Sequence, residues 1–64
     1  MNIRVGDVVK VTSDVYGFKG FLGTVVDIAG TISRVNVPGS ADYGLSGSTV
    51  WPLFSTEFEV VSAW

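Results

Sequence analysis

Hydrophobic and polar residues alternate with a period of two along most of this chain, in short runs separated by glycine-containing turns. Such alternation places successive side chains on opposite faces of a strand, whereas helices show a period near 3.6. The run at residues 7–12 puts Val9 and Val11 on one face, opposite Lys10. The pattern predicts an all-β chain.

Four further strands are predicted after the first. They cover residues 21–28, 32–37, 48–54 and a last segment of Phe58, Val60 and Val61. The short turn at 29–31 joins two of them as a hairpin. Pro52 cannot donate a ladder hydrogen bond, so it is predicted to lie on an edge strand or at the end of its strand.

Glycine marks two loops and one strand. In the loop at 13–20, Gly17 and Gly20 are expected to supply positive φ angles. Gly23 lies within a strand and predicts a bulge or bend where backbones approach closely. The turn-rich segment 38–47 is expected to be a mobile loop.

Five short strands, a long first loop and a tight turn before the last strand predict a small five-stranded SH3-like β-barrel, with residues 1–64 as one domain. Within it, "VGDVVKVTSDVYGFKGFLGTVVDI" at 5–28 resembles the KOW element of SH3-like barrels in ribosomal proteins and transcription elongation factors. Lys19, Gly20, Gly23 and Val25 carry the resemblance. Loops of that element contact RNA or a protein partner, so the resemblance implies a binding function.

A second resemblance concerns the layout of the whole chain. The SH3-like barrel subunit on the stromal side of photosystem I is similar in length, in the aromatic loop before a Gly-Thr-Val strand (here 23–25), and in its ending, here "FSTEFEVV". This likeness implies a relative by fold, a small SH3-like barrel.

Size and composition favour association with a partner. A chain of 64 residues buries only about 60% of the surface that its unfolded form exposes. Its hydrophobic content is 47%, and it has no cysteine for a disulfide. Apolar surface is therefore expected to stay exposed, as at a partner or oligomer interface. No secretory signal or membrane helix is predicted, so we expect a cytoplasmic protein.

Charge argues against nucleic acid as the first choice of partner. The net charge is −2, and the four cations are scattered along the chain. Phosphate binding relies on clustered lysine and arginine. A KOW-type RNA- or ribosome-associated module that uses Lys10, Lys19 and Arg34 is kept as the alternative.

Catalytic chemistry has few candidates in this sequence. There is no histidine or cysteine to act as a base, nucleophile or zinc ligand. Glu57 and Glu59 share one strand face, where solvated carboxylates are the simpler interpretation. We expect no enzyme activity, no metal and no cofactor.

The aromatic residues are the strongest functional signal. Phe21, Phe54 and Phe58 are predicted core residues, together with Val25 and Ile28. The predicted binding residues lie in or beside loops, where aromatic side chains anchor partners: Tyr16, Phe18, Lys19, Tyr43 and Trp51. The sequence thus predicts a non-catalytic module that binds a protein, including a second copy of itself. Ordinary packing of the loops onto the barrel is the alternative, and Trp64 is expected to fold back or to dock on a neighbour.

Overall fold

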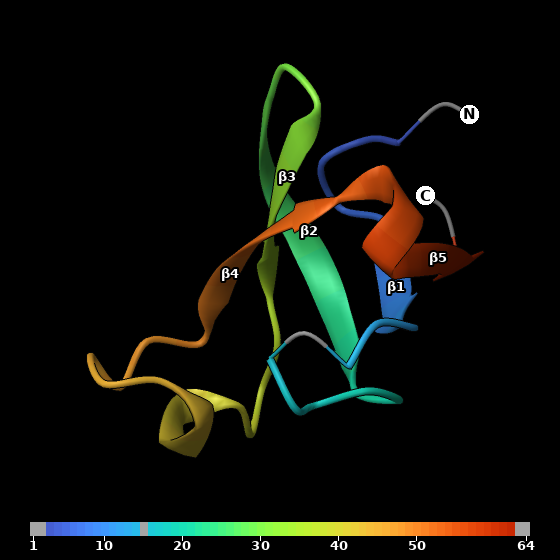
Figure 1. Cartoon of the computed structure of the whole chain (residues 1–64). Helices are drawn as coiled ribbons and strands as arrows, with labels where there is room; N and C mark the ends of the chain where they lie inside the picture. The colour runs from blue at the N-terminus through green and yellow to red at the C-terminus, as the bar shows by residue number, and fades with distance from the viewer. Residues whose placement is uncertain (1–2, 15, 63–64) are drawn as a thin grey trace.

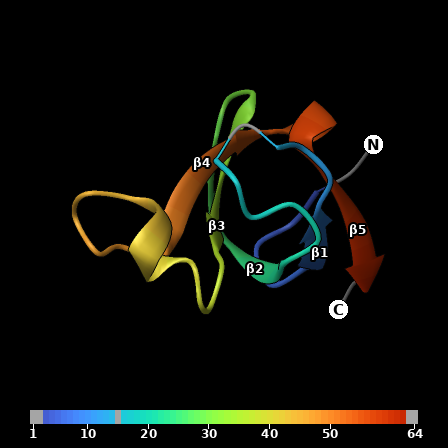
Figure 2. The same cartoon turned by 60° about the horizontal axis from the view of Figure 1, so that its bottom comes forward.

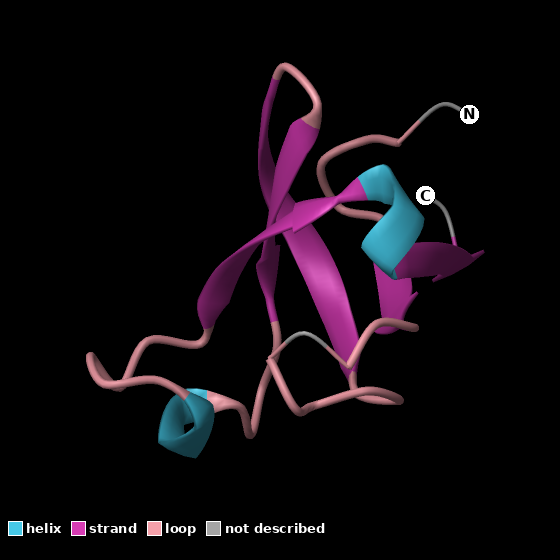
Figure 3. Cartoon of the chain, in the orientation of Figure 1, coloured by secondary structure: helices cyan, strands magenta, loops and turns pink. Residues whose placement is uncertain are grey.

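The computed structural model describes residues 3–14 and 16–62, so the predictions for Trp64 lie outside the described residues. The described part contains five strands and two short 3-10 helices, η1 and η2, with no α-helix (Figures 1 and 3). In chain order the elements are β1 (Val8–Val11), β2 (Leu22–Ala29), β3 (Ile32–Asn36), η1 (Ala41–Tyr43), β4 (Val50–Phe54), η2 (Ser55–Glu57) and β5 (Phe58–Ser62). The all-β prediction and its five strands are confirmed.

All five strands belong to one antiparallel sheet, in the order β4-β3-β2-β1-β5. The two edge strands, β4 and β5, are consecutive in the sequence and are joined only by η2. A three-residue link between opposite edges requires the sheet to curl, and Figures 1 and 2 show β4 crossing over towards β5. The edge position predicted for Pro52 is confirmed.

The core lies inside the curl and is built from one face of each strand. Its fully buried side chains come from all five strands and from the loops beside them: Val9, Val11, Phe18, Val25, Val35, Val37, Leu53 and Phe58. The alternation predicted for the first and last strands is confirmed, because Val9, Val11 and Phe58 point inward while Lys10 and Glu59 are exposed. Within the described residues, no helix has the length and apolar character to span a membrane.

Two predicted core residues lie at the surface instead. Phe54 is 50% exposed, because Leu53 occupies the inward position of β4 and the next residue must point outward. Ile28 is 38% exposed, although it pairs with the buried Ser33. Ile28 lies near the tip of the β2–β3 hairpin, where the sheet extends beyond the elements that cover the core (Figure 1).

Gly23 lies where β2 and β3 approach each other closely. A Cβ atom on Gly23 would lie 2.7 Å from the carbonyl oxygen of Asn36 and 2.7 Å from Cγ1 of Val35. The close approach is therefore confirmed, while the register shift falls later in β2, between Val25 and Asp27. Gly20, in the preceding loop, has the expected positive φ, at 91°.

Replacing Gly23 tests this packing. We expect Gly23→Ala to lower the free energy of unfolding by about 2–3 kcal/mol, because overpacked sites must shift backbone or side chains. Gly20→Ala is the matched control: an added Cβ there meets nothing within 4 Å, so only the backbone strain remains, about 1–2 kcal/mol. Urea unfolding of both variants measures the difference. A Gly23→Ala protein as stable as the wild type would contradict the close approach.

Candidate functional site: an aromatic cluster beneath an uncharged loop

The structure gathers the predicted aromatic residues into one cluster centred on Phe18. The ring centroid of Phe18 lies 5.0 Å from that of Trp51, 5.6 Å from Tyr16 and 5.7 Å from Tyr43. Tyr16 and Trp51 also contact each other, with centroids 4.7 Å apart. Separations in this range are favourable for tilted, edge-on and offset ring pairs. Four of the five predicted binding residues are thus neighbours in space.

The prediction that Phe18 contacts a partner is wrong, because its side chain is only 1% exposed. Two backbone hydrogen bonds fix the loop at 13–20 against β1: Gly20 N–H donates to the Val11 carbonyl at 2.7 Å, and Val11 N–H donates to the Phe21 carbonyl at 2.9 Å. The loop closed in this way carries Phe18 into the core. Lys19, the next residue, is exposed and remains a solvent-facing charge.

A buried serine that the sequence analysis did not single out holds Trp51 in place. The Trp51 Nε1–H donates to Oγ of Ser40 at 2.7 Å, and this hydroxyl donates to the Val37 carbonyl at 2.6 Å. Ser40 has no exposed surface. The Ser40 carbonyl also accepts the Tyr43 N–H at 3.0 Å, which begins η1. One serine therefore positions both rings that flank the loop after it.

β4 is an edge strand, and at every second residue its backbone N–H and C=O groups face away from β3. The Val37 N–H donates to the Thr49 carbonyl at 2.7 Å, just before the strand begins. Hydrogen-bonded and non-hydrogen-bonded pairs alternate along an antiparallel ladder. The backbone groups of Val50, Pro52 and Phe54 consequently point away from β3, towards the free edge.

Side chains form hydrogen bonds with these outward backbone groups. At the start of the strand the outward N–H donates to Oγ of Ser48 at 3.1 Å, and at its end the outward N–H donates to Oε1 of Glu57 at 2.9 Å. In the middle Pro52 has no N–H, and its carbonyl accepts the hydroxyl of Tyr16 at 3.2 Å. Free sheet edges template pairing with other chains. Here the capped edge disfavours the addition of a further strand to β4.

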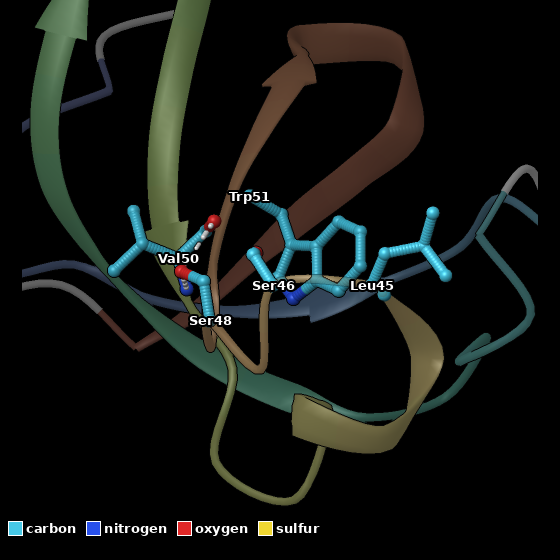
Figure 4. Close-up of a pocket in the computed structure, with 6 residues that line it drawn as sticks. Leu45, Ser46, Ser48, Val50 and Trp51 are labelled. Atoms are coloured by element: carbon cyan, nitrogen blue, oxygen red, sulfur yellow. Dashed lines mark hydrogen bonds between the residues drawn. The ribbon is translucent and has the colours of Figure 1, made fainter.

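The loop between η1 and β4 presents an apolar side chain beside a pocket. Leu45 is fully exposed, and it borders an open pocket of about 300 Å³. The pocket is lined by Gly44, Leu45, Ser46, Ser48, Val50 and Trp51 (Figure 4). Figure 4 shows the side chain of Leu45 and the Trp51 indole on the same side of β4. A Cβ on Gly44 would lie 2.8 Å from Cη2 of Trp51, so the missing side chain lets the loop lie against the ring.

The residues that line the pocket carry no charge, although two charged residues lie beside them: the exposed Asp42 in η1, and Arg34, which borders Ser48, Val50 and Pro52. Residues 43–56 contain no aspartate, glutamate, lysine or arginine. Among the predicted RNA-binding cations, Arg34 lies opposite Asp27 on β2, and Lys10 lies opposite Glu59 on β5. Opposite-charge cross-strand neighbours of this kind offset each other's fields. The described residues contain no group of three side chains suited to hold a metal ion.

Removing the Ser40 hydroxyl tests its positioning role. We expect Ser40→Ala to lower the free energy of unfolding by about 1–3 kcal/mol, because it leaves the Trp51 indole N–H without its acceptor. In a Trp64→Phe background, the emission of Trp51 alone should shift to the red as water reaches the indole. Ser46→Ala, at an exposed serine of the neighbouring loop, is the control and should change stability by no more than about 0.5 kcal/mol. Equal effects of the two changes would contradict the role of Ser40.

Comparisons with protein-family models, curated proteins and solved structures found no match to this chain. The candidate site therefore rests on the geometry of its own residues.

Proposed function

We propose that this chain is a non-catalytic binding module of SH3-like fold that holds a protein partner on one surface. We define this contact surface by Tyr16, Tyr43, Leu45 and Trp51. The SH3-like assignment is supported by the strand order, by the long first loop and by the 3-10 turn between the last two strands. The KOW-like positions are compatible with it, since Gly23 permits close strand packing and Val25 is buried.

The observation that carries the proposal is a fully exposed leucine beside a pocket whose wall is a fixed tryptophan. Burying a leucine side chain contributes about 1.5–3 kcal/mol, which in the isolated chain is not realised. Tyrosine and tryptophan are enriched among the residues that dominate binding energies. Trp51 is already held by Ser40, and the hydroxyl of Tyr16 is bonded to β4, so few rotamers are lost when a partner binds.

The chemistry of the surface also limits the kind of partner. The pocket residues carry no charge, so an anchor for a phosphate or for a strongly charged peptide would have to come from outside the pocket, where Arg34 borders Ser48 and Val50. The centres of protein interfaces are likewise depleted of charge and rich in aromatic residues. Because the edge of β4 is capped, the partner contributes side chains rather than an added strand.

Site-specific photocrosslinking in the source cell tests the surface. A photoreactive amino acid replaces Ser46 at the pocket, or Thr31 at the tip of the β2–β3 hairpin, which lies at the opposite end of the chain fold in Figure 1. Both positions are exposed hydroxyl residues, so they are matched controls. We expect light-dependent protein adducts of discrete mass from position 46 and none from position 31. Adding Leu45→Ser should remove most of the adduct, because the apolar anchor is lost.

No adduct from position 46, or equal adducts from both positions, would contradict the contact surface. Adducts that survive Leu45→Ser unchanged would place the partner elsewhere on the molecule.

Retention on immobilised single-stranded RNA tests the alternative, a KOW-type module using Lys10, Lys19 and Arg34. We expect the protein to pass through at about 0.15 M salt, because scattered cations beside carboxylates release few counterions. A control with a clustered basic patch, such as a polylysine-tagged version of the same chain, should be retained. Strong retention of the untagged chain that falls steeply as salt rises would favour the RNA function over the proposed one.

A further inference from the structure

We infer that the partner at the contact surface is a second copy of this chain, with each copy placing its Leu45 in the pocket beside the other's Trp51. The inference rests on the proposed function, since it names the occupant of the same surface. The two copies form a dimer with two-fold symmetry, in which the contact surface of one copy meets the same surface of the other.

The projecting side chain lies in a loop, predicted to be mobile, whose two ends are held by hydrogen bonds and packing. Leu45 is the most exposed of the large apolar side chains in the described residues. Before it, η1 is closed by the hydrogen bond between Tyr43 N–H and the Ser40 carbonyl, and Gly44 lies against the Trp51 ring. After it, Oγ of Ser48 accepts the Val50 N–H. The loop is therefore fixed on both sides of the leucine.

The receiving pocket has room for such a side chain. Its volume of about 300 Å³ equals that of several water molecules, each of which occupies about 30 Å³ in the liquid. The indole of Trp51 gives it an apolar wall, and Gly44, which packs against the same ring, adds no side chain to the pocket. Ser46 and Ser48 add neutral polar groups at the rim. An aliphatic side chain matches this lining.

The projecting residue and the pocket belong to one patch, since Leu45 itself lines the pocket. In a two-fold interface the same patch is used by both subunits, so a projection on one copy meets the pocket of the other, and the reverse. Two identical contacts form at once, and the association closes at two subunits.

Charge favours a second copy over a charged partner. Each chain carries a net charge of −2, so two copies repel wherever carboxylates meet. The pocket residues carry no charge, so this repulsion is weaker where two pockets meet than where carboxylates such as Asp42 meet. A strongly charged partner would gain little from the pocket itself, whereas a neutral apolar loop of the same chain fits.

The capped edge of β4 determines how the copies meet. Tyr16, Ser48 and Glu57 occupy the outward backbone groups, so the two sheets do not join edge to edge along β4. Contact is made by side chains of the loop and the indole. This distinguishes the dimer from open-ended strand addition, which would produce chains of many copies.

Sedimentation equilibrium of the purified chain between about 10 µM and 1 mM tests the dimer. We expect a monomer–dimer equilibrium in the wild type and at least a tenfold larger dissociation constant for Leu45→Asp and for Ser46→Asp. Leu22→Asp is the matched control, because Leu22 is also an exposed leucine, at 56%, but it does not line the pocket and pairs with Lys10 on β1, on the side of β2 away from β3 and β4. It should leave the dissociation constant within twofold. Circular dichroism confirms that each variant is folded.

A wild type that stays monomeric up to 1 mM overturns the inference, as does a dimer that both Leu45→Asp and Ser46→Asp leave intact. Equal weakening by Leu22→Asp also overturns it, because the contact would then lie elsewhere. The crosslinks from position 46 distinguish the contact surface from the identity of its occupant. Adducts of twice the chain mass support both proposals, adducts of other masses with a monomeric wild type overturn only the second copy, and no adducts with a monomeric wild type overturn both.

Discussion

The whole structure depends on Phe18, the residue through which the first loop packs onto the core of the curled sheet. A five-stranded sheet in a chain of 64 residues leaves one end of its core open, and Phe18 fills that end from the loop at 13–20. The bonds between this loop and β1 fix the ring there. Tyr16, Tyr43 and Trp51 then pack on Phe18, so the outer layer of the core is also the candidate surface.

Because the same aromatic residues form the outer core and the candidate surface, most substitutions at this surface also change the stability of the fold. A change at Trp51 removes ring contacts with Tyr16 and Phe18 and leaves Ser40 without its donor, so it alters the fold as well as the surface. Leu45 is the exception, because it is fully exposed and packs against nothing that the core needs. In a domain with such a small core, a residue of this kind is the one through which binding can be separated from folding.

Periodicity predicted the strands but could not predict the loops. The alternation around Val9 and Phe58 identifies the buried face, because one register satisfies the whole strand. Phe54 was misplaced because a β4 of five residues has two apolar faces, and only the pairing with β3 shows that Leu53 is the inward one. Phe18 was misplaced because a loop has no period, so its sequence does not show which aromatic residue turns inward. The sequence contains one indirect signal for Ser40: a tryptophan packed in a core, such as Trp51, needs an acceptor for its N–H.

The same limit explains why the site was predicted as a set of residues but not as a geometry. The aromatic types at 16, 43 and 51 were enough to expect a shared surface, whereas the exposure of Leu45 and the capping of the β4 edge depend on backbone directions that only the folded chain has. These two features act together. An exposed apolar residue beside an open strand edge would invite unlimited pairing, but with Pro52 in the strand and its carbonyl bonded to Tyr16 that route is disfavoured. What remains open at this edge is contact through side chains, whose shape and lack of charge would select the partner that we propose.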